Sequence, residues 1–453
     1  MSDLAETAGA GRKAGRDAIR TALIGLGVQG RALIGAMLRM GPEMGVRLQA
    51  VCDLWPWQLQ DAERCLSRIR LTGHAAHPYT DWRQMLDAEG SLDAVIVATP
   101  DFCHAEQTVE SLRRGLSVYC ESPMSNSLAD ARRIVLAARG SQGRLQIGNQ
   151  RRSNRQYRFC AEQLMAKANL LHRVTTVRSQ WHRSRASWAP RGWPAGSEVS
   201  TQVLTQHGYE SMDELLNWRW RRRLGGGLFH ESACHQLDVC SWFLGEALPR
   251  SVMACGNGGY WTQSEHPDSV AATFEFVTAD GVVRATHDTM TTNSNMGCYE
   301  HFMGDEATLM ISQSPGYTAA YREGWVEAGN PNAAAQWQKW EHWVDVGIVL
   351  DVEGHHAPSA AGAAEALPED GVADVRQSPR PPRYAVPAIM RYPAHLPHLR
   401  NFFMAFRGVE SLRYPPDLAY RSLAMTLKAR QAADAQRTLA FEPGEFVVEN
   451  ASA

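Results

Sequence analysis

At 453 residues the chain is longer than one ordinary domain, so we expect it to fold as two or three domains. Its 46 Lys and Arg residues nearly balance its 48 Asp and Glu residues, which excludes the strongly basic surface that binds nucleic acid or an anionic membrane. The nine cysteines form no CxxC pair. This distribution is typical of free thiols in a reducing compartment and not of a disulfide framework or a metal site, so we predict no bound metal.

The first 19 residues are polar and rich in Ala, Gly and Arg, and they lack the apolar core of a signal peptide. No later stretch is long and apolar enough to cross a bilayer. We expect residues 1–19 to be a disordered leader. We expect the protein to be cytoplasmic, with neither a membrane nor a nucleic acid as a partner.

The first motif lies in TALIGLGVQGRAL, residues 21–33, where an apolar run ends in a glycine turn and passes into a helical pattern up to Met40. The first glycine of such a turn allows a tight bend, the second lets a phosphate approach, and the third lets the helix pack on the strand. The helix N-terminus then offers N–H groups to a pyrophosphate. The predicted cofactor-binding residues of this turn are Gly25, Gly27, Val28, Gln29 and Gly30.

A second strand, residues 48–52, ends on Asp53. An acid at this place binds both ribose hydroxyls of an adenosine and repels a 2′-phosphate, so NAD is favoured over NADP. The alternative is an ordinary βαβ turn followed by a surface aspartate. The turn and the acid together predict a dinucleotide-binding domain over residues 20–150.

The rest of residues 20–150 alternates between predicted helices and predicted strands. Helices are predicted at 57–69, 82–88, from about 104 to 114 and at 128–139, with strands at 92–98, 117–120 and 145–148. This alternation predicts a doubly wound parallel sheet, in which ligands bind at the carboxyl ends of the strands. The further predicted cofactor-binding residues at these ends are Thr99, Pro100, His104, Glu121 and Gln150. For His104 the alternative, that it caps its helix, stays open.

After residue 150 the pattern changes to longer strands joined by hairpin turns. Strands are predicted at 174–181, 251–256, 269–276, 282–290 and 307–311, with a main helix at 229–244. Consecutive strands of this kind predict an antiparallel sheet and an α+β domain over 151–440. Residues 352–388 are rich in Ala, Pro and Gly and predict a flexible insertion. Helices at 398–407 and 418–433 and a closing strand at 441–448, in a C-terminal segment 441–453, complete the prediction.

Several stretches together resemble the glucose–fructose oxidoreductase/inositol dehydrogenase (Gfo/Idh/MocA) family. They are ALIGLGVQGR, VCDLWP, AVIVATPDFCHAEQ, LSVYCESPMSNSLADA, QIGNQRRSN, NWRWRRRLGGG, CHQLDVCSWFLG, EHFMGDEATLMIS and HLRNFFMAFRG. The resemblance implies an N-terminal Rossmann domain and a C-terminal α+β domain whose largely antiparallel, open-faced sheet supports a dimer or tetramer. It also implies NAD(P) and hydride transfer at a carbinol carbon of a sugar or cyclitol.

Two positions depart from the family pattern. The family usually has Glu-Lys-Pro after the fifth strand, with the lysine beside the nicotinamide, whereas this chain has Ser122 between Glu121 and Pro123. A serine hydroxyl carries no positive charge and is a poor acid or base at neutral pH. Where an Asp-x-Gly-x-His pattern is common, the chain has the longer Glu231 and replaces the glycine by Ala233.

The predicted catalytic residues centre on one helix. Glu231, His235 and Asp238 are spaced i, i+4 and i+7 and therefore share a face. We expect a carboxylate beside the imidazole to raise its basicity, so that His235 takes the hydroxyl proton as hydride leaves. His230 is a candidate to replace the missing lysine, with Ser122 beside it. The alternatives are a core or surface histidine for His235 and a solvent-facing helix start for His230.

Substrate binding is predicted at Arg151 and Arg152, whose donors suit sugar hydroxyls or a carboxylate, and at Trp181, which suits a sugar face. The alternatives are interdomain ion pairs for the arginines and a core or interface role for the tryptophan. The run from Arg219 to Arg223 indicates a solvated patch or the rim of a ligand site.

We therefore predict an NAD-dependent oxidoreductase that acts on a sugar, glycoside or cyclitol. One rival is an enzyme that retains NAD and oxidises the sugar only transiently, so that elimination or glycoside cleavage follows. Another is a non-catalytic homologue that binds NAD or a sugar.

Overall fold

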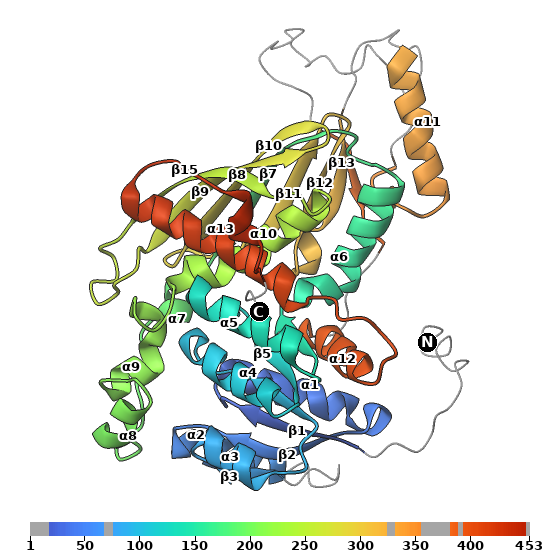
Figure 1. The fold of residues 1–453 in the computed structure, drawn as a ribbon. Coiled ribbons are helices and arrows are strands. Elements are labelled where there is room, and N and C mark those ends of the chain that lie inside the picture. Colours follow the sequence, from blue (N-terminus) through green and yellow to red (C-terminus); the bar gives the residue numbers. More distant parts are fainter. Residues whose placement is uncertain (1–17, 68–75, 324–330, 355–380, 388–392, 450–453) are drawn as a thin grey trace.

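The computed structural model describes residues 18–67, 76–323, 331–354, 381–387 and 393–449. Two sheets dominate the fold (Figure 1), the first built mostly from the N-terminal third of the chain and the second from the rest. Residues 1–17 of the expected leader, 1–19, lie outside the described residues. Its last residue, Ile19, already belongs to the first strand. No helix among the described residues is long and apolar enough to cross a membrane.

The first sheet has six parallel strands in the order β3-β2-β1-β4-β5-β6. The predicted doubly wound parallel sheet is confirmed. Its strands are β1 (Ile19–Ile24), β2 (Val46–Cys52), β3 (His77–Tyr79), β4 (Ala94–Val97), β5 (Ser117–Glu121) and β6 (Leu145–Gly148). Side chains alternate between the faces of a strand, and both faces are covered. In β1, Ala22 and Ile24 pack in one apolar cluster, whereas Ile19 and Leu23 pack in another.

Helices cover both faces of this sheet. They are α1 (Val28–Met44), α2 (Pro56–Ser67), α3 (Trp82–Ala88), α4 (His104–Arg113) and α5 (Leu128–Gly140). The apolar sides of α1 and α2 pack in the cluster of Leu23, and those of α3, α4 and α5 pack in the cluster of Ala22. The predicted helix and strand positions in this part of the chain are confirmed to within a few residues.

The second sheet has nine strands in the order β14-β13-β12-β11-β7-β10-β9-β8-β15. They are β7 (Val174–His182), β8 (Pro249–Asn257), β9 (Ser269–Thr278), β10 (Gly281–Met290), β11 (Cys298–Gly304), β12 (Ala307–Ile311), β13 (Ala319–Arg322), β14 (Arg383–Ala385) and β15 (Leu439–Ala440). Every neighbouring pair is antiparallel except β7 with β10. The expected, largely antiparallel sheet is confirmed.

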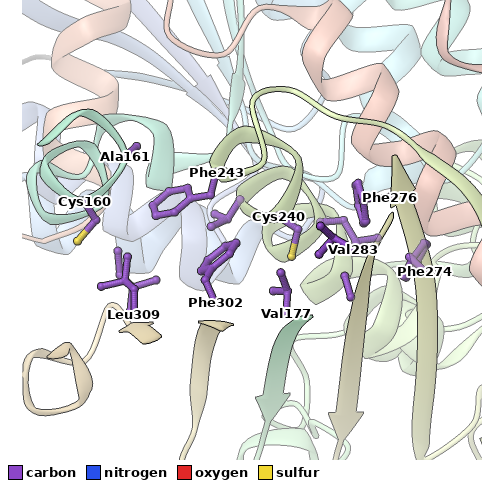
Figure 2. Packing of buried hydrophobic residues seen from close by; sticks show 14 of the residues in the cluster. Cys160, Ala161, Val177, Cys240, Phe243, Phe274, Phe276, Val283, Phe302 and Leu309 are labelled. Atoms are coloured by element: carbon purple, nitrogen blue, oxygen red, sulfur yellow. The ribbon is translucent and has the colours of Figure 1, made fainter. Parts of the chain in front are cut away.

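One face of the second sheet is buried under helices. The main helix, α10 (Gly227–Phe243), and the helical segment of α6 (Arg155–Phe159) and Cys160–Lys167 lie on it. Figure 2 shows Phe243 and Cys240 of α10 packed against Val177 of β7 and Phe302 of β11. Alternate residues of β9 and β10 are buried, so the other face of these strands is the more open one.

The C-terminal helices connect the two sheets. Leu399, Phe402 and Phe403 of α12 (His395–Phe406) pack in the cluster of α1, although α12 lies in the range expected for the second domain. The long helix α13 (Pro416–Ala435) contributes Tyr420 to a core of the first sheet and Met425 to the core of the second. These two helices therefore hold the two sheets in place relative to each other.

Two expectations for the C-terminal third need correction. The closing strand at 441–448 is wrong, because the only pairing in this part of the described chain is β15, which precedes it. Pro443 and Gly444 open a 3-10 turn, which the side chains of Glu442 and Glu445 cap. Within the expected insertion 352–388, residues 383–385 form β14, paired with β13, and residues 355–380 lie outside the described residues. Helix α11 (Pro331–Asp345), just before this range, was not predicted.

A segment of the second half of the chain reaches over the first sheet. We call residues 183–224 the arm; it contains α7 (Arg185–Trp188), α8 (Thr201–Gln206) and α9 (Met212–Asn217). The arm extends beside α2 and α3 (Figure 1). Trp55 donates from Nε1 to the Ser197 carbonyl oxygen at 2.6 Å, and the rings of Phe102 and Tyr209 meet edge to face. The arm thus covers the edge where β2 and β4 end.

Candidate functional site

One cavity of about 680 Å³ lies between the first sheet, the arm and α10. The residues predicted to bind the cofactor that line this cavity are Gly25, Gly27, Val28, Gln29, Asp53, Thr99, Pro100, His104, Glu121 and Gln150. They come from the carboxyl ends of five neighbouring parallel strands, as the fold requires. Gly30 does not line the cavity, and its role is in packing.

The glycine turn has the geometry that close packing and a ligand demand. Gly25 has a φ of +94°, and a Cβ there would lie 2.6 Å from the Ala98 carbonyl oxygen. A Cβ on Gly30 would lie 1.9 Å from the Gly25 carbonyl oxygen. A Cβ on Gly27 would meet nothing within 4 Å, and no side chain caps the start of α1. The uncapped N–H groups of α1 and the empty space above Gly27 fit a pyrophosphate.

Asp53 is held in place by the backbone. Its Oδ2 accepts a hydrogen bond from the Leu26 N–H at 2.7 Å, and its Oδ1 accepts one from the Trp55 N–H at 2.8 Å. Burial raises the pKa of Asp53 to about 6, so the side chain is mostly ionised at neutral pH. Each carboxylate oxygen has a further lone pair, which suits the two ribose hydroxyls of NAD. The residues at this end of the cavity therefore fit the dinucleotide.

Glu121 lies at the other end of the predicted cofactor site. It accepts a hydrogen bond from Nε2 of Gln29 at 2.8 Å, and a Cβ on Gly148 would lie 2.5 Å from its Oε2. Burial raises the pKa of Glu121 to about 7. The glycine on β6 thus leaves room for a carboxylate that lines the same cavity as the turn residues.

The ring of His104 is fully occupied by backbone groups. Its Nδ1 lies 2.9 Å from the Pro123 carbonyl oxygen and its Nε2 lies 2.8 Å from the Thr99 carbonyl oxygen. Burial lowers its pKa to about 4. His104 therefore links the ends of β4 and β5 at the cavity wall. The alternative that it caps its helix is wrong, because its ring nitrogens lie against carbonyl oxygens.

Ser122 stands where the family usually has lysine. It lines the cavity, and its hydroxyl lies 3.2 Å from Sγ of Cys234, the residue before His235 on α10. Burial raises the pKa of the Cys234 thiol to about 12, so this thiol is neutral. The contact joins two neutral groups from the two halves of the molecule and supplies no charge there.

His235 lines the cavity, but its partner is an amide. Its Nδ1 lies 3.2 Å from Oδ1 of Asn149, and Nδ2 of Asn149 donates to Oδ2 of Asp238 at 2.9 Å. A carboxylate can only accept, so the Asn149 amide must turn its NH2 group to Asp238 and its oxygen to His235. Nδ1 of His235 then carries the proton and Nε2 carries the lone pair. Among the described residues, Nε2 has no hydrogen-bond partner.

The expected effect on the pKa of His235 is wrong in direction. Burial, together with the positive charge of Arg151, lowers this pKa well below its usual value. The two carboxylates that share its helix face are engaged elsewhere: Glu231 forms an ion pair with Arg219, and Asp238 forms one with Arg152. Neither touches the imidazole, so His235 is neutral at neutral pH.

His230 lies away from the cavity wall. It is completely buried, and its Nε2 is 3.1 Å from the Ser125 carbonyl oxygen and 3.5 Å from Oδ2 of Asp101. Burial lowers its pKa to about 3. The alternative that His230 faces solvent at the start of its helix is wrong. The helix begins three residues earlier, at Gly227, and His230 is buried in it.

The two arginines predicted to bind substrate are engaged in buried ion pairs. Arg151 pairs with Glu300, and Arg152 pairs with both Asp238 and Glu246. Neither arginine lines the cavity. Both form ion pairs, but with residues of the same predicted domain and not between the domains. Trp181, in contrast, lines the cavity, with its ring centroid 5.9 Å from that of His235.

Several wall residues were not singled out from the sequence. They are Asp101, Arg183, Arg191, Gln313 and His395. Arg183 follows Trp181 by two residues at the end of β7. Its place so near a predicted substrate-binding residue could have identified it from the sequence. Asn149 was also missed, although it directly follows β6. The ligand-rim alternative for the start of the Arg219 run is supported, since Arg219 lines the cavity.

Comparison with known proteins agrees with this geometry. Residues 19–149 match the family described as an oxidoreductase family with an NAD-binding Rossmann fold, and residues 165–309 match the GFO/IDH/MocA C-terminal domain. A 1,5-anhydro-D-fructose reductase of Ensifer adhaerens is 27% identical over 293 residues, which are 63% of this chain and 75% of the relative. In two other curated relatives the matched part spans only 33% and 46% of their length.

Two solved structures share the fold over most of the chain. Levoglucosan dehydrogenase in complex with NADH and L-sorbose superposes with a TM-score of 0.63 at 15% identity, covering 94% of this chain and 100% of the other. The WlbA dehydrogenase of Bordetella pertussis with NADH and UDP-GlcNAcA has a TM-score of 0.60 at 20% identity, covering 94% and 99%. At this identity the likeness concerns the fold alone.

Proposed function

Because the chain belongs to the Gfo/Idh/MocA family of oxidoreductases and has its NAD-binding Rossmann domain, we propose that it transfers hydride between NAD and a carbinol carbon of a sugar, glycoside or cyclitol. Bound NAD supplies the hydride acceptor. The turn residues and Asp53 hold the dinucleotide, and the second domain supplies the side chains that face the substrate. We assign these roles to a Rossmann domain over 20–150 and a substrate domain over 151–440.

The observation that carries the proposal is the chain of contacts from Asp238 through Asn149 to His235. It fixes the imidazole with a proton on Nδ1 and a lone pair on Nε2, at the wall of the cavity that the cofactor residues line. A neutral imidazole can accept the hydroxyl proton of a carbinol at Nε2 as the hydride leaves its carbon. Asp238 is a positioning residue in this scheme, since it acts through Asn149.

A second function is favoured by one feature. Ser122 and Cys234 place two neutral groups where a lysine would lie. A site without that cation suits an enzyme that retains NAD and oxidises the sugar transiently before elimination or glycoside cleavage. A non-catalytic homologue that binds NAD and a sugar would have no need of either the lysine or a base.

The test is product analysis with NAD-loaded protein and a panel of sugars, glycosides and cyclitols. Steady accumulation of NADH, equal to the sugar oxidised, supports the oxidoreductase. Cleavage or elimination without net NADH supports the second function and contradicts the first. Sugar binding without either product would identify a binding protein.

We also propose a cytoplasmic homo-oligomer, a dimer or tetramer. The eight described cysteines are all free, as expected in a reducing compartment. The more open face of the nine-stranded sheet offers a surface for a second copy: Met253 of β8, Val277 of β9 and Val282 of β10 are about half exposed. NAD is preferred to NADP in this proposal because Asp53 would repel a 2′-phosphate.

A further inference from the structure

Three arginines of the arm line the cavity: Arg183, Arg191 and Arg219. Arg219 has a carboxylate partner in Glu231. The guanidinium groups of Arg183 and Arg191 form neither an ion pair nor a hydrogen bond with any described residue. The buried arginines of the same half of the chain differ in this respect, because Arg151 and Arg152 each pair with a carboxylate.

Arg183 is held in a defined place. Its guanidinium carbon lies 5.8 Å from the ring centroid of Trp181 and 5.9 Å from that of Trp188. Burial and the neighbouring Arg219 lower its pKa, whereas Glu231 opposes this shift. The positive charge of Arg183 also acts on His235, whose pKa it lowers. A half-buried guanidinium that pairs with no carboxylate of the described residues and lies beside the predicted base is suited to an anionic group of a ligand.

The acids that line the cavity do not neutralise this charge. Glu231 is taken by Arg219, and Asp53 lies at the ribose end, held by the backbone. Burial raises the pKa of Asp101 to about 8, so this side chain is mostly protonated at neutral pH. Glu121 accepts a hydrogen bond from Gln29, and Glu106 pairs with Arg83. Among the described residues, Arg183 therefore has no carboxylate as an ion-pair partner.

Arg191 lies near Arg183, whose charge acts on it, but differs from it in other neighbours. Both line a smaller cavity together with Val28 and Gln29, at the start of α1, and the charge of Arg31 in α1 acts on Arg191. This position faces the place expected for the cofactor pyrophosphate. Arg191 can thus bind the cofactor, whereas Arg183 lies beside Trp181, whose ring also neighbours His235.

We propose that the substrate is an anionic sugar whose carboxylate or phosphate group binds Arg183 while its reacting carbinol lies at Nε2 of His235. The inference rests on the proposed function, because it uses the same cavity and the same base. Trp181, beside both residues, packs against the apolar face of the sugar ring. Arg is suited to both acid groups, since its planar donors match a carboxylate or a phosphate.

The test is calorimetric titration of NAD-saturated protein with matched ligands: D-glucose, D-glucuronate and D-glucose 6-phosphate, and the same three forms of D-galactose and of D-mannose. In at least one series we expect an acid form to bind about tenfold or more tightly than the neutral form. Which acid form it is distinguishes a carboxylate from a phosphate. Added salt should weaken only the binding of the acid form.

Variants locate the effect. Arg183→Gln should remove the preference for the acid form and leave the Kd for NAD unchanged. Arg191→Gln should do the opposite, weakening NAD and keeping the preference. Arg185→Gln is the matched control, because Arg185 is exposed, lies two residues along the arm and contacts Tyr260, outside the cavity wall. It should change neither affinity.

Three results would overturn the inference: no acid form bound more tightly than its neutral form, a preference that survives Arg183→Gln, or a loss of NAD affinity in Arg183→Gln. The last would make Arg183 a ligand of the cofactor. The proposed function fails separately. If an acid form binds through Arg183 but yields no NADH, the inference on the substrate stands and the proposed reaction is wrong.

Discussion

The imidazole of His235 is oriented by a side-chain amide that itself binds a carboxylate. This arrangement fixes which ring nitrogen carries the proton and keeps the ring neutral, because the negative charge of Asp238 is taken by Arg152. The helical spacing correctly put three side chains on one face. It could not reveal Asn149, which lies 86 residues before His235 in the chain and reaches it only because the segment Gln150–Ser153, after β6, packs against α10. The sequence therefore predicted the positions of these side chains on the helix better than their hydrogen bonds and charges.

Asp101 offers a test at the same scale. Its carboxyl group is buried, with Oδ2 3.5 Å from Nε2 of His230, and burial and Glu231 raise its pKa from 3.8 to about 8. Between these two pH values the folded protein keeps a proton that the unfolded chain has lost, so stability falls as pH rises, by at most roughly 1.4 kcal/mol per pH unit. Asp101→Asn cannot ionise. We expect its Tm to exceed the wild-type Tm at pH 8 and the difference to shrink towards pH 5.

Asp280→Asn is the control, because Asp280 is exposed at a hairpin turn. Its Tm difference from the wild type should not vary over the same pH range. A constant difference for Asp101→Asn would contradict the raised pKa.

At the scale of elements, two glycines of the turn from β1 to α1 have different roles: Gly30 allows close packing, and Gly27 leaves room for a ligand. A Cβ at Gly30 meets the Gly25 carbonyl oxygen, whereas one at Gly27 meets open space where the pyrophosphate is expected. The sequence predicted this turn and most elements around it, since each has a strong local pattern. The arm was not predicted, because its short helices are stabilised by contacts such as those of Trp55 and Phe102 with a distant segment.

The two glycines should therefore respond differently to alanine. Gly30→Ala should lower the Tm of the cofactor-free protein by several degrees, because the backbone must shift to admit the Cβ. Gly27→Ala should leave that Tm nearly unchanged and raise the Kd for NAD about tenfold or more. Gly35→Ala, later in α1 and with open space around its Cβ, should leave the Kd for NAD unchanged and raise the Tm slightly, because alanine favours the helix. Thermal unfolding and NAD titration check all three, and unchanged NAD binding in Gly27→Ala would contradict the assigned pyrophosphate site.

At the scale of the whole molecule, the cofactor residues and the predicted base come from different sheets. The wall of one cavity joins them, and α12, α13 and the arm hold the two halves together. The doubly wound parallel sheet could be predicted from the alternation of strands and helices, and the mostly antiparallel second sheet from consecutive strands with hairpin turns. The buried ion pairs of Arg151 and Arg152 could not, because their partners follow from how the second domain folds. Changes on α10 should affect catalysis and not cofactor binding.

Parallel measurement of kcat and of the Kd for NAD in the wild type and in His235→Ala tests the central claim most directly, with a sugar whose oxidation releases NADH. A base of this type contributes roughly 10²- to 10⁴-fold. We expect kcat to fall by a factor in that range while the Kd for NAD stays unchanged, because His235 lies on α10 and the dinucleotide site lies on the first sheet. Wild-type turnover in His235→Ala would show that Nε2 of His235 does not accept the proton.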